Sequence, residues 1–145
     1  MKCVIIDGRL PEIAFQTLTG SFTTDTSYTF SSQPIGTAHS SRIVIVAIAY
    51  INSSPASASV TVGGASATEI AGCAKRTTSG GSTEFQIKCF RVAVPAGTTA
   101  SIVVTTSATG CWIGVWSAYY LRSATPVDAK GNPLTGRTLS WSSSN

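Results

Sequence analysis

The sequence predicts an all-β protein: one antiparallel β-sandwich domain, either Ig-like or jelly-roll-like. Ser and Thr supply 41 of the 145 residues and Gly a further 13, a composition that favours strands and turns over helices. Alternating or β-branched apolar runs recur along the chain. Turn residues separate these runs at short intervals, as they do in sandwiches and barrels. The length is that of a single domain with a real core.

The first 40 residues differ from the rest, because their short apolar groups are separated by polar Ser and Thr. We expect an extended N-terminal arm over residues 1–40, which can carry one or two strands. The sandwich domain then follows over residues 41–145 and ends in an irregular C-terminal tail. Four residues of the arm, Cys3, Val4, Ile5 and Ile6, are candidates for contact with a neighbouring chain.

Residues 43–50 form a continuous, mostly β-branched apolar run. Such a run predicts a central strand that is covered on both faces. The next strand is expected over residues 57–62. It ends at Gly63-Gly64, where a positive-φ turn can send residues 65–70 back as its hairpin partner.

Residues 83–94 change phase, because the apolar set shifts from odd-numbered to even-numbered positions near Cys89. A strand with a period of two can do this only through a bulge or a bend. Further strands are expected over residues 100–105 and 111–121. Aromatic Trp112, Trp116 and Tyr120 occupy one face of the last strand, opposite Cys111 and its apolar neighbours on the other face.

Cys73 and Cys89 are equally distant from Gly81, so a hairpin centred on that glycine places the two cysteines opposite each other. Opposed residues in antiparallel strands are close enough for an intrachain disulfide. The alternative is two small buried thiols, which a reducing cytosol favours. Cys111 is expected to be buried and reduced.

No catalytic, cofactor-binding or metal-binding residue is predicted. Each carboxylate stands alone in the sequence, and His39 lies in a polar loop without the GxSxG motif that would support a Ser-His-Asp triad. An exposed loop histidine is the simpler interpretation. The four cysteines form no CxxC pair and have one histidine to join them, which argues against zinc.

Charge and hydropathy also argue against nucleic acid and membrane partners. The net charge of +4 comes from scattered Lys and Arg, without the clustered basic patch of a nucleic-acid surface. The longest uncharged apolar stretch, residues 43–51, is shorter than the ~20 residues that a membrane helix needs. The apolar run at residues 3–6 is too short for a signal peptide, so we expect synthesis in a cytoplasm.

The segments "VTVGGASATEI" (60–70), "RVAVPAGT" (91–98) and "IVVT" (102–105) occur in this order. Over residues 41–120, the chain resembles small β-sandwich structural proteins and fibre modules of tailed-phage virions. The resemblance implies a location in the virion, in head decoration, neck or collar, or tail attachment. It carries no catalytic residues, and the four cysteines are not a feature that such modules require.

Two functions follow as hypotheses. The first is a non-enzymatic virion structural protein, a homo-oligomer that binds neighbouring capsid, neck or tail subunits through its sandwich and its N-terminal arm. The alternative is a glycan-binding module that uses Trp112, Trp116 and Tyr120 as a stacking platform, although aromatics on a long strand more often belong to a core or an interface.

Overall fold

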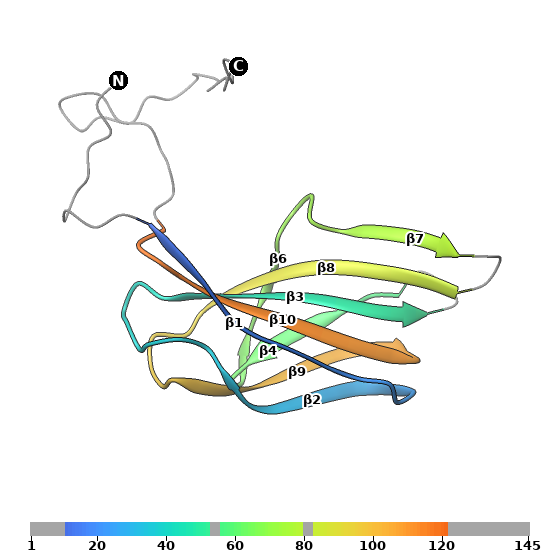
Figure 1. Cartoon of the computed structure of the whole chain (residues 1–145), viewed down its shortest axis with the longest axis horizontal. Coiled ribbons are helices and arrows are strands. Elements are labelled where there is room, and N and C mark those ends of the chain that lie inside the picture. The colour runs from blue at the N-terminus through green and yellow to red at the C-terminus, as the bar shows by residue number, and fades with distance from the viewer. Residues whose placement is uncertain (1–10, 53–55, 80–82, 122–145) are drawn as a thin grey trace, which may run out of the picture.

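The computed structural model describes residues 11–52, 56–79 and 83–121, which form two antiparallel sheets packed against each other (Figure 1). The predicted all-β sandwich is confirmed. Within these three ranges no helix is long and apolar enough to cross a bilayer.

The two sheets differ in size. The larger sheet has the order β1-β10-β3-β8-β6, with β7 also paired to β8, and the smaller sheet has the order β2-β9-β4-β5. The strands of the larger sheet are β1 (Glu12–Ser21), β3 (Ile43–Asn52), β6 (Thr68–Glu69), β7 (Lys75–Ser79), β8 (Thr83–Ala93) and β10 (Gly110–Tyr119). Those of the smaller sheet are β2 (Asp25–Pro34), β4 (Ser59–Val62), β5 (Ala65–Ser66) and β9 (Thr99–Ala108).

This strand order decides between the two sandwich types. Successive long strands alternate between the sheets, so β1-β10-β3-β8 lies opposite β2-β9-β4-β5. In an Ig-like sandwich the first two strands would be neighbours in one sheet. Alternation with antiparallel neighbours throughout is the double Greek key of a jelly roll.

The predicted division at residue 40 is wrong for the described part of the arm. β1 pairs with β10 and β2 pairs with β9 along most of their lengths. Tyr28, Phe30 and Ile35 are buried in the common core. Residues 11–40 are therefore integral to the sandwich. Of their apolar residues, Tyr28 and Phe30 of β2 face inward, whereas Ile13 and Phe15 of β1 are exposed. Residues 1–10 and the expected tail over residues 122–145 lie outside the described residues.

The inner faces of the two sheets make up the core. In β3, Val44, Val46, Ile48 and Tyr50 are fully buried, whereas the alternate residues are only half-buried. β3 is central, as predicted, between β10 and β8. The prediction that both of its faces are covered is not met within the described chain, because only the inner face packs against another sheet.

The predicted bulge or bend near Cys89 is absent from the pairing of β8 with β3. β8 pairs with β3 in one unbroken register from Glu84 to Ala93, so the strand keeps its phase. The apparent shift arises because Gln86, a polar residue, occupies a buried inward position and bonds there to the Tyr50 hydroxyl.

The predicted turn at Gly63-Gly64 is confirmed. Both glycines have positive φ, and β4 pairs with β5 across them.

The cysteines behave in two ways. Cys73 and Cys89 form a disulfide with their Cα atoms 5.7 Å apart. The register of β7 on β8, in which Lys75 opposes Ile87, is the register of a hairpin centred on residue 81, although residues 80–82 themselves lie outside the described residues. The alternative of two thiols is therefore wrong. Cys111 is a buried free thiol, as predicted.

Arg42 is the largest fully buried side chain of the described residues. It lies immediately before β3, and its three guanidinium nitrogens donate to the backbone carbonyls of Gly36, Val94 and Ala96, each over 2.7 Å. The guanidinium therefore ties the loop before β3 to the loop between β8 and β9 at one end of the sandwich.

Candidate functional site

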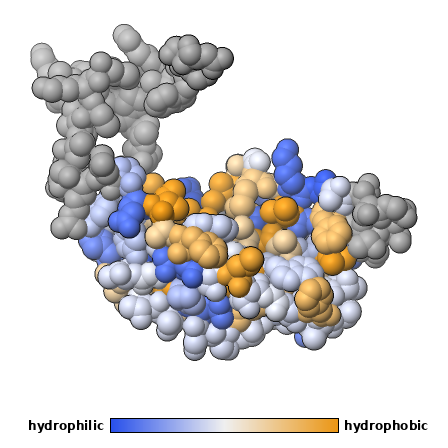
Figure 2. Space-filling model, in the orientation of Figure 1, coloured by the Kyte–Doolittle hydropathy of each residue, from blue (hydrophilic) through white to orange (hydrophobic). Residues whose placement is uncertain are grey.

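The outer face of the larger sheet is the main candidate site. Strand register places one apolar residue beside another across β1, β10, β3 and β8 on this face. We define the apolar face by its outward residues: Ile13, Phe15, Leu18, Ile43, Ile45, Ala47, Ala49, Ile51, Phe85, Ile87, Trp112 and Trp116. Figure 2 shows apolar side chains gathered over the strands of this sheet.

Several of these side chains are strongly exposed. Ile13, Phe15 and Leu18 of β1 are 61%, 59% and 71% exposed, and Phe22, just beyond the strand, is 82% exposed. Phe85 and Ile87 of β8 are also exposed. Isolated apolar residues are normal on a protein surface, but a contiguous patch marks an interaction site. The patch extends from the edge strand β1 across to β8.

Glycines determine how the two indoles lie on this face. A Cβ at Gly20 would overlap the Trp112 ring, and one at Gly110 would lie 2.8 Å from it. A Cβ at Gly114 would lie 2.7 Å from the Trp116 ring. Because glycine has no side chain, each indole can lie down along the sheet and cover bare backbone. The apolar face is therefore low in relief at its centre.

The indoles are also covered from the side by phenylalanines. Phe22 packs edge-on against Trp112 with ring centroids 4.8 Å apart, and Phe15 packs against Trp116 at 5.6 Å. Both tryptophans are consequently only half-buried by the chain itself. Sequence reasoning identified the tryptophans but missed Phe15, Leu18 and Phe22, which it had assigned to an arm. Their alternation along residues 13–22 was the available signal.

The glycan platform is not assembled as expected. Trp112 and Trp116 lie on the apolar face, but the Tyr120 hydroxyl pairs with the ring Nε2 of His39 at 3.1 Å, at the end of β10. Sugar stacking needs polar groups around the ring to bind hydroxyls. The neighbours opposite the indoles in the sheet are Phe15, Ile45, Gly20 and Ala49, which supply no polar side chain.

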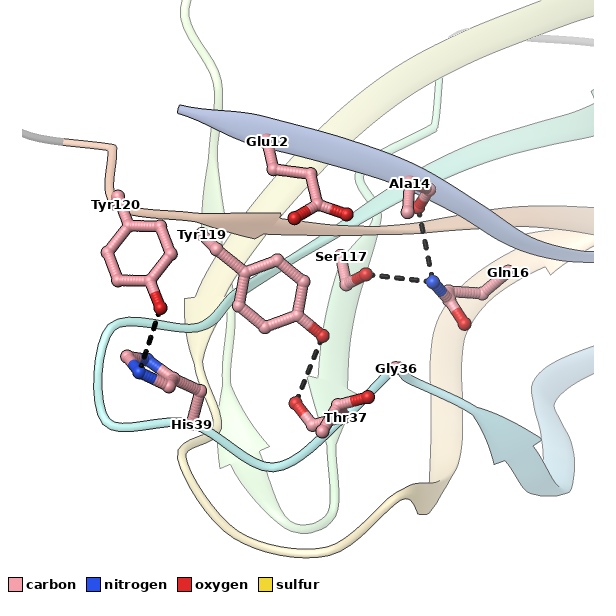
Figure 3. Close-up of a pocket in the computed structure, with 9 residues that line it drawn as sticks. All are labelled: Glu12, Ala14, Gln16, Gly36, Thr37, His39, Ser117, Tyr119 and Tyr120. Carbon is pink, nitrogen blue, oxygen red and sulfur yellow. Dashed lines mark hydrogen bonds between the residues drawn. The ribbon is translucent and has the colours of Figure 1, made fainter. Parts of the chain in front are cut away.

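The second candidate site is a hollow of about 380 Å³ at one end of the sandwich. It lies between β1, the end of β10 and the loop before β3 (Figure 3). Glu12 and the rings of Tyr119 and Tyr120 line it, together with His39. The Tyr119 hydroxyl donates to the Thr37 carbonyl at 3.0 Å. These bonds hold the loop against β10.

His39 has no free acceptor atom for acid–base chemistry. Its Nδ1 accepts from the backbone N–H of Ser41 at 3.0 Å and lies 2.8 Å from the Ser41 hydroxyl, while Nε2 bonds to Tyr120. The Ser41 hydroxyl oxygen also accepts the backbone N–H of Tyr120. These bonds join the loop before β3 to the end of β10. His39 is half-buried, which corrects the expectation of an exposed loop histidine.

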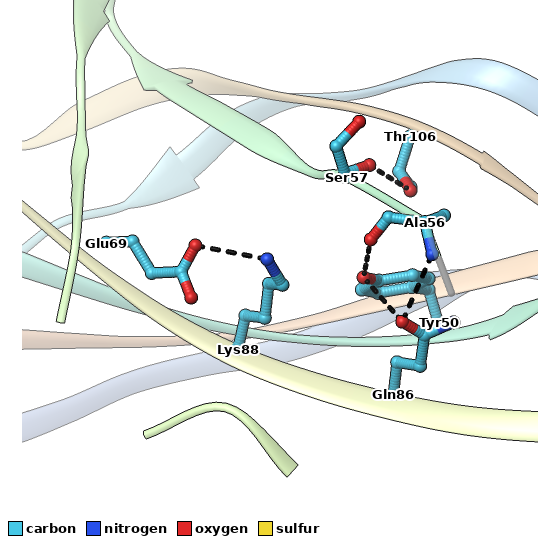
Figure 4. A network of polar contacts seen from close by, with 7 residues as sticks. All are labelled: Tyr50, Ala56, Ser57, Glu69, Gln86, Lys88 and Thr106. Atoms are coloured by element: carbon cyan, nitrogen blue, oxygen red, sulfur yellow. Dashed lines mark hydrogen bonds and ion pairs between the residues drawn. The ribbon is translucent and has the colours of Figure 1, made fainter. Parts of the chain in front are cut away.

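Polar groups on the inner side of the sandwich are also engaged with one another (Figure 4). The Tyr50 hydroxyl donates to the Ala56 carbonyl and lies 3.2 Å from Gln86 Oε1. Lys88 and Glu69 form an ion pair at 3.1 Å. Burial raises the pKa of the Tyr50 phenol, so this hydroxyl remains a neutral donor. The side chains of Tyr50, Gln86, Lys88 and Glu69 are therefore bonded within the protein.

The remaining predicted sites are located as follows. Cys3, Val4, Ile5 and Ile6 lie outside the described residues. Burial raises the pKa of the Cys111 thiol to about 12, which makes this cysteine a packing residue and not a nucleophile. Within the described ranges no three His, Cys, Asp or Glu side chains cluster as metal ligands do.

Comparison of the chain with known protein families, with curated proteins and with solved structures found no significant match.

Proposed function

We propose that this protein is a non-enzymatic structural protein of a tailed-phage virion that binds neighbouring subunits through the apolar face. The observation that carries the proposal is the outer surface of the larger sheet, which is apolar over four strands and has strongly exposed residues at β1. A continuous apolar strand such as β3 is typical of sheets covered on both sides. A neighbouring subunit would supply the missing cover.

The protected edge of the sandwich supports the same choice of face. On the side away from β1, the sheets end in the short strands β5, β6 and β7, and β7 carries Lys75 and Arg76. Short and charged edge strands prevent unwanted pairing. The β1 side ends in a ten-residue strand whose only charged residue is Glu12. One edge of the sandwich is thus protected against strand pairing, whereas the β1 edge lacks this protection.

A virion location is supported by the sequence resemblance over residues 41–120 and is compatible with a jelly roll, an architecture that capsid proteins use. Binding through the expected N-terminal arm is now limited to residues 1–10, since β1 and β2 already belong to the sandwich. The side chains of His39 and Ser41 are both occupied by hydrogen bonds within the protein, which supports the proposal of a non-enzymatic protein.

Incorporation into particles tests the proposal. Particles of the phage or induced prophage that encodes the chain would be purified on a density gradient and analysed by quantitative mass spectrometry. The variants are Leu18→Asp on the apolar face and, as the matched control, Thr29→Asp on the outer face of β2, where Thr29 is exposed. We expect several copies per particle for the wild type and the control, and at least about tenfold fewer for Leu18→Asp.

Two results would count against the proposal. Particles without the chain would refute the virion role, and equal incorporation of Leu18→Asp would refute the role of the apolar face. A glycan array with the purified chain tests the alternative function. Binding that is abolished by Trp116→Ala but not by Leu18→Asp would favour the glycan-binding module.

A further inference from the structure

We infer that the occupant of the apolar face is a second copy of this chain, packed sheet against sheet about a two-fold axis parallel to the strands. The inference rests on the proposed function and names one partner of the proposed site. In such a dimer β1 of one copy lies over β8 of the other, and β10 of one copy lies over β3 of the other.

The size of the face matches a dimer interface. Its four long strands have ten or eleven residues each. At about 3.3 Å per residue and about 4.8 Å between strands, they span roughly 33 by 19 Å. Two such faces would bury on the order of 1,200 Å², the lower end of the range for stable, specific interfaces. Phe22 and β7 extend the area beyond this estimate.

The shape of the face also suits another sheet. Sheets that pack face to face lie about 10 Å apart with their strands nearly aligned, and this requires low relief. The indoles of Trp112 and Trp116 lie along the sheet over Gly20, Gly110 and Gly114, so they do not hold a second sheet away.

The charged residues at the margin of the apolar face favour a second copy as the partner and a two-fold axis parallel to the strands. The charged residues that share the outward side are the cations Lys75 and Arg91, at the β7 and β8 margin. An axis across the strands would bring these cations against their own copies, and like charges placed opposite each other are destabilising. An axis parallel to the strands brings them over β1, which carries no cation. An isologous dimer can therefore form without repulsion.

Sedimentation of the full chain at several concentrations tests the inference. We expect a reversible dimer for the wild type and for the control Thr29→Asp. Leu18→Asp and Ile87→Lys should each raise the dissociation constant at least about 30-fold. Mixing these two variants should restore much of the dimer, because the mixed pair has one native contact and one contact between opposite charges. Circular dichroism of every variant establishes that the sandwich is folded.

A wild type that stays monomeric at concentrations of about 100 μM would overturn the inference, and the face would then be covered by another subunit or by this chain's own residues 122–145. A dimer that neither variant weakens, or variants that do not recover on mixing, would also overturn it. These outcomes are separate from the proposed function, since a monomeric chain whose incorporation into particles depends on Leu18 would leave that function in place.

Discussion

Replacing Arg42 by Met should destabilise the sandwich strongly. Arg42 is fully buried and its guanidinium donates three bonds of 2.7 Å to backbone carbonyls. Met fills a similar volume but donates nothing, so the carbonyls of Gly36, Val94 and Ala96 lose these donors. The two loops that Arg42 joins would then be held only by their remaining contacts.

The magnitude follows from two opposing contributions. Hydrogen bonds to a charged group contribute about 1.5–3 kcal/mol each, so three bonds contribute roughly 4.5–9 kcal/mol. Removing the charge also removes its desolvation cost, which is several kcal/mol. We therefore expect Arg42→Met to lower the free energy of unfolding by about 3–5 kcal/mol. This is a large fraction of the ~5–15 kcal/mol that stabilises a typical domain.

Urea denaturation followed by tryptophan fluorescence measures the effect. The matched control is Arg91→Met, because Arg91 is exposed on β8 and its replacement should change stability by less than about 0.5 kcal/mol. Arg42→Lys should lie between the wild type and Arg42→Met, since an ammonium group cannot span three carbonyls in the planar fork. A loss below about 1 kcal/mol for Arg42→Met would refute the reasoning.

Three further predictions concern the cysteines and one glycine. Reducing the Cys73–Cys89 disulfide, which closes a separation of 16 residues, should cost about 3 kcal/mol, and reductant should have no such effect on Cys73→Ser. Burial raises the pKa of Cys111 to about 12, above its unfolded value of about 8.5. The folded state therefore holds this proton longer, and stability should fall by up to about 1.4 kcal/mol per pH unit above pH 9. Cys111→Ala should flatten that slope, and an unchanged slope would contradict the assignment. Gly20→Val should displace the Trp112 indole and cost about 1–3 kcal/mol, so unaltered emission and stability would argue against the close packing.

Much of the fold could be predicted because the relevant signals are local. The β-branched run of β3 and the Gly63-Gly64 turn depend on neighbouring residues. The disulfide depended only on symmetry about residue 81. The assignment of residues 11–40 to an arm failed because their partners, β10 and β9, are about 65 to 107 residues away in sequence. A strand with such distant partners gives no local sign of them.

The candidate site was harder to predict. The apolar character of β3 and β10 was visible in the sequence, but whether their outer faces are covered depends on the assembled sheet. Gln86 is a second residue whose environment could not be predicted from the sequence. A polar residue at a buried position looks like a phase error until its bond to Tyr50 is known.

The position of β10 affects how the chain folds during synthesis. The last strand of the described residues, β10, lies between β1 and β3, so β1 and β3 cannot pair with β10 until residue 119 has left the ribosome. Until then β3 presents an unpaired apolar edge on the side where β10 will bind. Topologies dominated by distant contacts fold slowly, over milliseconds to seconds, and exposed strand edges promote aggregation in the meantime. A nascent chain released before residue 119 would lack the strand that joins the two halves of the larger sheet.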